Sequence, residues 1–168
     1  MLFNVSGPGQ TNMAFGAWSL MHVNLFPCRW SANVFADEGL MRTAEGQAQA
    51  LSSWWGQDPG MPPNSNSRIA PLATTPQKTT IAGYAAWYTE TLIPTSLDLA
   101  TCDGGQLILW HTSEGQVRSS LGPGELIQLW VVDVDGEAIV IDASTFPAES
   151  QDAAAELEAI VSSIFIEP

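Results

Sequence analysis

Two histidines, His22 and His111, are the only imidazoles in the chain, and each lies in a run of apolar residues. An imidazole can act as a general base or bind a metal ion. If neighbouring strands bring the two together, a third ligand such as Asp37 or Glu90 could complete a zinc site. A half-buried histidine with satisfied hydrogen bonds is the simpler expectation. We therefore predict no metal site, and keep His22 or His111 as the base of an alternative hydrolase.

Cys28 and Cys102 are the only thiols, and neither lies in the CxxC pattern of a redox pair or a zinc half-site. An even number of cysteines permits one disulfide. By loop-closure entropy, such a bridge would stabilise the fold by roughly 4 kcal/mol. Two unpaired buried thiols are the alternative, and the residues alone leave both possibilities open.

Four acidic residues lie in LWVVDVDGEAIVIDAS, residues 129–144, around a possible turn. The stretch lacks the glutamate that an EF-hand loop needs at its twelfth position. Asp135-Gly136 between apolar strands instead predicts a type I′ hairpin turn. That turn pairs Asp133 with Ala138 and puts Asp142 about 13 Å further along the strand. The two carboxylates of a glycosidase lie within about 9.5 Å of each other, so we predict that Asp142 is a strand-end cap or turn acid.

The predicted turn also sets the register of its two strands. The expected pairs are Val134 with Glu137, Val132 with Ile139, Trp130 with Ile141 and Leu129 with Asp142. Most of both faces is apolar, which favours central strands that are covered on both sides.

The sequence contains no GxSxG, SxxK, HExxH, Walker A or GxGxxG motif. We therefore assign no catalytic residue and expect no cofactor. Trp54 and Trp55 lie at a predicted helix end beside a loop rich in Pro, Gly, Asn and Ser, residues 56–77. Exposed aromatic rings there would suit a partner protein, a glycan or an apolar ligand. The alternative is that both rings wrap the helix and cover the sheet.

Composition limits the classes of partner and function that remain. The 168 residues fit one domain, 1–168. The net charge of −13 disfavours nucleic acid, and the five bases are too scattered for an anionic membrane. No apolar run reaches the 18 residues of a membrane span, and no leader or anchor is recognised, although one could precede this sequence. The bases are Arg29, Arg42, Arg68, Lys78 and Arg118.

The pattern of apolar residues predicts an α+β fold. Helical spacing and end signals indicate helices at 43–56 and 150–164. Strand-type patterns occupy 17–26, 30–37, 78–83, 84–93, 105–112, 114–121, 125–134 and 137–144. Because most strands neighbour one another in sequence, we expect a largely antiparallel sheet, covered by a helix of the N-terminal half and an amphipathic C-terminal helix.

Three stretches resemble a known family: VNLFPCRW around Cys28, TCDGGQLILW around Cys102, and residues 122–168. They look like the extracytoplasmic domains of uncharacterised secreted or membrane-anchored proteins of the actinobacterial and Chloroflexi type. The resemblance implies an α+β sandwich similar to PsbP-like and LpqN-like lipoproteins, an exported protein and a disulfide between the two cysteines. It supplies no catalytic residues.

We therefore expect a non-enzymatic secreted or surface-tethered domain that binds a partner protein or a small ligand. A hydrolase that uses His111 or His22 is the alternative. An enzyme should place a histidine in a pocket within hydrogen-bond range of a serine or an acid. A binding domain should show exposed aromatic side chains and apolar surroundings for both imidazoles.

Overall fold

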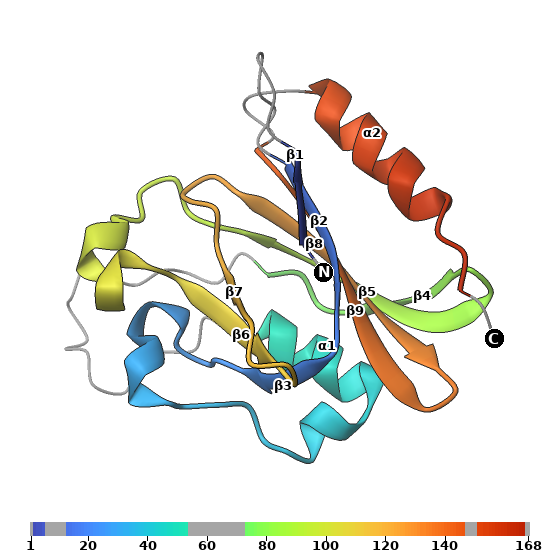
Figure 1. Ribbon diagram of the computed structural model, residues 1–168, viewed down its shortest axis with the longest axis horizontal. Coiled ribbons are helices and arrows are strands. Elements are labelled where there is room, and N and C mark those ends of the chain that lie inside the picture. The colour runs from blue at the N-terminus through green and yellow to red at the C-terminus, as the bar shows by residue number, and fades with distance from the viewer. Residues whose placement is uncertain (1, 6–12, 54–72, 147–150, 167–168) are drawn as a thin grey trace.

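Two antiparallel sheets form the framework of the protein. The computed structural model describes residues 2–5, 13–53, 73–146 and 151–166. Within them, the larger sheet has six strands in the order β1-β2-β9-β8-β5-β4, and the smaller sheet has three in the order β3-β6-β7 (Figure 1). The larger sheet comprises β1 (Leu2–Val5), β2 (Met13–Trp18), β4 (Gln77–Ile81), β5 (Tyr84–Leu92), β8 (Leu126–Val134) and β9 (Glu137–Thr145). The smaller sheet comprises β3 (Leu20–Val23), β6 (Ile108–Thr112) and β7 (Val117–Ser119).

Tight turns set the local order of the larger sheet. Asp135 and Gly136 have φ values of 53° and 90°, as a type I′ turn requires. The resulting register confirms every predicted pair, including Leu129 with Asp142. A second hairpin joins β4 to β5 through Ala82 and Gly83, which also have positive φ. The predicted hairpin between β6 and β7 is likewise present.

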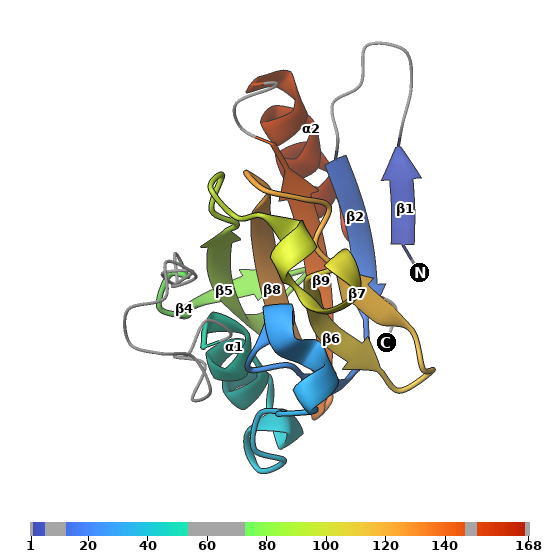
Figure 2. The same ribbon diagram turned by 90° about the vertical axis from the view of Figure 1, so that its left-hand side faces the viewer.

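The larger sheet is covered on both faces. Helix α1 (Ala44–Ser52) begins where the Thr43 hydroxyl accepts a hydrogen bond from the Gly46 amide. On this face, Leu51 of α1 and Trp110 of β6 join Leu129 of β8 in one apolar cluster. Helix α2 (Gln151–Ser162) lies on the opposite face (Figure 1), where its buried residues pack with residues of β8 and β9. Figure 2 shows β6 and β7 in front of the larger sheet and α2 behind it.

The predicted α+β class with antiparallel strands is confirmed, but the strands form two sheets, because the chain changes sheets at Ser19. The segment 17–26 is divided between β2 and β3, and the register of β3 shifts between Leu20 and His22. The predicted strand 30–37 is wrong. The 3-10 helix η1 (Pro27–Ala32) occupies its first part, because proline fixes φ and cannot donate to a sheet. Beyond η1, an isolated bridge pairs Asn24 with Phe35.

Candidate functional site

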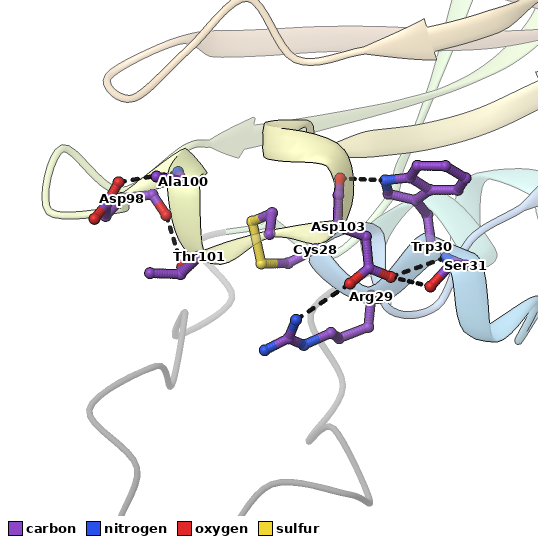
Figure 3. Close-up of a disulfide and its surroundings, with 9 residues drawn as sticks. Cys28, Arg29, Trp30, Ser31, Asp98, Ala100, Thr101 and Asp103 are labelled. Atoms are coloured by element: carbon purple, nitrogen blue, oxygen red, sulfur yellow. Dashed lines mark hydrogen bonds and ion pairs between the residues drawn. A yellow bond between two sulfur atoms is a disulfide. The ribbon is translucent and has the colours of Figure 1, made fainter.

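The predicted disulfide between Cys28 and Cys102 is confirmed, and it joins a 3-10 helix to the junction between two others (Figure 3). Cys28 lies in η1, and Cys102 lies between η3 (Leu99–Thr101) and η4 (Asp103–Gly105). The Cα atoms are 4.6 Å apart, within the range that disulfides span. The bridge therefore links the connection after β3 to the connection before β6.

Polar contacts reinforce the disulfide. The Asp103 carboxylate accepts hydrogen bonds from the hydroxyl and the amide of Ser31, and Arg29 Nη1 lies 3.2 Å from its Oδ1 (Figure 3). Trp30 Nε1 donates to the Asp103 carbonyl at 2.8 Å. The Ser31 hydroxyl and, to a lesser extent, Arg29 lower the pKa of Asp103. This carboxylate is thus engaged in holding η1 and η4 together.

The outer face of the smaller sheet brings the two histidines together. His22 of β3 and His111 of β6 are directly opposite in register. The Phe35 ring stacks on His22 with centroids 4.6 Å apart, and it meets the edge of His111 at 5.8 Å. We call His22, Phe35 and His111 the histidine cluster. All three side chains are half-buried, and the exposed Val117 pairs with His111.

The acids predicted as a third zinc ligand lie in other contacts. Asp37 Oδ1 accepts a hydrogen bond from the Gly39 amide at 2.7 Å. Glu90 accepts hydrogen bonds from the Tyr88 hydroxyl and from Gln128. In the described part of the chain, no group of three His, Cys, Asp or Glu residues could hold a metal ion. The structure therefore brings the two histidines together without either predicted acid.

A buried ionic cluster connects the two sheets. Arg118 of β7 donates from Nε to Asp142 of β9 at 2.5 Å, and from Nη2 to Glu125 and Ser144 at 2.7 Å each. The Arg118 side chain is 2% exposed, and both carboxylates are fully buried. We call Arg118, Glu125, Asp142 and Ser144 the Arg118 cluster. The prediction that Asp142 is a strand-end cap or turn acid is wrong, because the residue lies inside β9 and faces the core.

Burial and charge act in opposite directions in the Arg118 cluster. Burial opposes the charge of Arg118, but Asp142 and Glu125 outweigh it and raise its pKa. Burial raises the pKa of Asp142, and Arg118 offsets this only in part because two carboxylates share one guanidinium. Glu125 also accepts hydrogen bonds from the Ser120 hydroxyl and the Leu121 amide. The cluster is therefore saturated with internal contacts.

A third polar group lies across β5 and β8. Gln128 Nε2 donates to the Tyr88 hydroxyl at 2.8 Å, and that hydroxyl donates to Glu90. Burial, followed by the hydrogen bond to Glu90, raises the pKa of Tyr88. The Tyr88 ring also packs on Trp130, with centroids 4.9 Å apart. Like the Arg118 cluster, this group directs its polar atoms at one another.

Two sequence predictions of a binding surface lie wholly or partly outside the described residues. Trp54 and Trp55 lie outside the described residues, and so does most of the predicted loop 56–77. The described end of that loop runs beside β5, where Ala73 forms a bridge with Thr91. The candidate site that the structure offers is therefore the histidine cluster.

These features define an α+β protein with two antiparallel sheets, a disulfide between the connection after β3 and the connection before β6, and a buried ionic cluster that joins the sheets. The sequence matches no protein-family model and no curated protein. Among the described helices, none is long and apolar enough to cross a membrane.

Proposed function

We propose that this protein is a non-enzymatic extracytoplasmic domain, secreted or tethered to the cell surface, that binds a small ligand through the histidine cluster. The observation that carries the proposal is the arrangement of His22, Phe35 and His111. Their rings come from three segments of the chain and meet on a half-exposed face. Aromatic rings of this kind offer contact area at low cost in conformational entropy.

The surroundings of the imidazoles favour binding over hydrolysis. The ring contacts of His22 and His111 within the described residues are with Phe35, and the two histidines are cross-strand partners. A hollow of about 60 Å³ lies nearby, but Trp18, Ser19 and Thr112 are among its lining residues and neither histidine is. An imidazole that acts as a base needs a hydroxyl or thiol that donates a proton to it, or an orienting acid, within hydrogen-bond range.

The proposed location rests on the Cys28–Cys102 disulfide. Structural disulfides persist in oxidising compartments and are rare in reducing ones. The resemblance to the extracytoplasmic domains of PsbP-like and LpqN-like lipoproteins agrees with this location and is part of the same proposal. A surface with net charge −13 suits a domain that stays in solution without binding anionic partners.

The hydrolase alternative supplies the test. We expect the wild-type protein and the double variant His22→Asn/His111→Asn to hydrolyse chromogenic esters, phosphates and glycosides at equal, non-saturating rates. Asparagine keeps a polar side chain of similar reach but cannot act as a base near neutral pH. Initial rates across a substrate series would measure this. Saturable turnover that the double variant loses would overturn the proposal and establish the hydrolase.

A further inference from the structure

We propose that His22 and His111 together bind a divalent transition-metal ion, with Cu²⁺ held most tightly. This inference rests on the proposed function, because it names the ligand of the histidine cluster. Imidazole nitrogen is a preferred ligand of Zn²⁺, Cu²⁺ and Ni²⁺. For a given set of nitrogen ligands, Cu²⁺ binds more tightly than Ni²⁺ or Zn²⁺.

The strand register places the two imidazoles on neighbouring strands, at paired positions of the smaller sheet. His22 and His111 are cross-strand partners, and the next pairs follow without a gap, since the Asn24 amide donates to the Leu109 carbonyl at 2.9 Å. Directly opposed residues of antiparallel strands have Cβ atoms about 5 Å apart. Two imidazoles that extend from such positions can each place a nitrogen about 2 Å from one ion.

Phe35 orients the cluster without covering the ligand atoms. Its ring lies nearly parallel to the His22 ring, at 20°, and nearly perpendicular to the His111 ring, at 84°. A metal ion binds an imidazole nitrogen in the plane of the ring, whereas stacking covers the face of the ring. The contact therefore restricts the His22 side chain in advance, which lowers the entropy lost on binding.

The ring nitrogens of this cluster are available within the described structure. No hydrogen bond between described residues uses a nitrogen of His22 or His111. The acidic surface, at net charge −13, also favours the approach of cations.

The decisive experiment uses the full chain without an affinity tag. Because the chain has two histidines, its imidazole ¹H–¹³C spectrum contains two Cε1–Hε1 signals. We expect substoichiometric Cu²⁺ to broaden both signals at the same metal-to-protein ratio, and Zn²⁺ to shift both. If only one signal responds, or if neither does, the shared site is refuted on the unaltered protein.

Variants then test the chelate by calorimetric titration with Cu²⁺. Either His22→Asn or His111→Asn should weaken binding by roughly tenfold or more, because the second imidazole no longer acts at high effective concentration. Val117→Thr, which alters the exposed neighbour paired with His111 and keeps both imidazoles, is the matched control and should bind like the wild type. Equal affinity in the double variant His22→Asn/His111→Asn would overturn the inference.

The two proposals fail in different ways. Saturable hydrolysis that depends on the histidines would remove the proposed function, whatever the metal titration shows. Absence of metal binding, with no hydrolysis, would leave a binding domain whose ligand is not a metal ion.

Discussion

The Arg118 cluster and the histidine cluster place polar side chains among apolar neighbours in opposite ways. In the Arg118 cluster, the cation meets two carboxylates in the space between the sheets, and hydroxyl and amide groups fill the remaining positions. In the histidine cluster, half-buried imidazoles meet an aromatic ring on an outer face. Buried polar groups that hydrogen-bond one another stabilise the fold. Imidazole nitrogens without an internal hydrogen bond can instead bind an external ligand.

The energetic consequences of removing a side chain differ accordingly. A buried charge is tolerated only while its partner is present, because its desolvation is costly. A half-exposed imidazole keeps access to water, so its loss changes stability little. Substitutions should therefore separate the two clusters clearly: one set should change folding, and the other should change binding.

The largest effect is expected for Arg118→Met. Methionine fills similar space but leaves Glu125 and Asp142 buried without a cation. We expect a loss of about 3–5 kcal/mol in the free energy of unfolding, measured by urea denaturation. Lys78→Met, which removes an exposed cation of β4, is the control and should cost less than about 1 kcal/mol.

A compensating variant sharpens this prediction. Adding Glu125→Gln and Asp142→Asn to Arg118→Met removes both carboxylate charges and should recover part of the lost stability. If Arg118→Met costs no more than the control, the cluster does not hold the sheets together, and its contrast with the histidine cluster disappears.

A smaller effect is expected when the disulfide is removed. The double variant Cys28→Ser/Cys102→Ser should lose about 2–4 kcal/mol and melt at a lower temperature, because a bridge across 74 residues restricts the unfolded chain. The fold should persist, since Asp103 still binds Ser31 and Arg29. Calorimetry of the variant and of the reduced wild type should give matching melting temperatures. Two free thiols in the native, non-reduced protein would contradict the bridge and weaken the proposed extracytoplasmic location.

Local features of this fold could be predicted from the sequence because short-range chemistry determines them. Asp135-Gly136 specifies its turn, and a two-residue turn then determines every cross-strand pair along β8 and β9. The C-terminal helix could be predicted in the same way from its apolar spacing, and α2 lies within the predicted range. The disulfide was implied by resemblance, since spacing alone left two free thiols open.

Contacts between distant segments could not be predicted in this way. Arg118 looked like an isolated base because its partners come from β9 and from the connection before β8. One signal was present: the predicted register placed Asp142 opposite Leu129, a residue that would face the core. A charge opposite a core residue indicates a buried partner. The pairing of His22 with His111 depends on the chain changing sheets at Ser19, which no local pattern specified.

The smallest effect that still tests the comparison is expected for Asp142→Asn. Its carboxyl pKa lies above the usual value because burial opposes the negative charge and Arg118 offsets this only in part. Asparagine mimics the neutral carboxyl, and it can accept a hydrogen bond from Arg118 and donate one to Ser144. It also leaves Arg118 balanced by Glu125. We therefore expect a loss of about 1 kcal/mol or less at neutral pH, well below that of Arg118→Met.

The pH dependence of Asp142→Asn has a definite sign. A carboxyl whose pKa is raised by folding contributes stability that is fully present below the unfolded-state pKa and is lost as the pH rises through the folded-state pKa. From acid toward neutral pH, the wild type should therefore lose stability relative to the variant. Urea unfolding of both proteins from pH 4 to 7 measures this difference. A difference that stays constant, or that changes in the wild type's favour, would mean that Arg118 fully compensates the burial of Asp142.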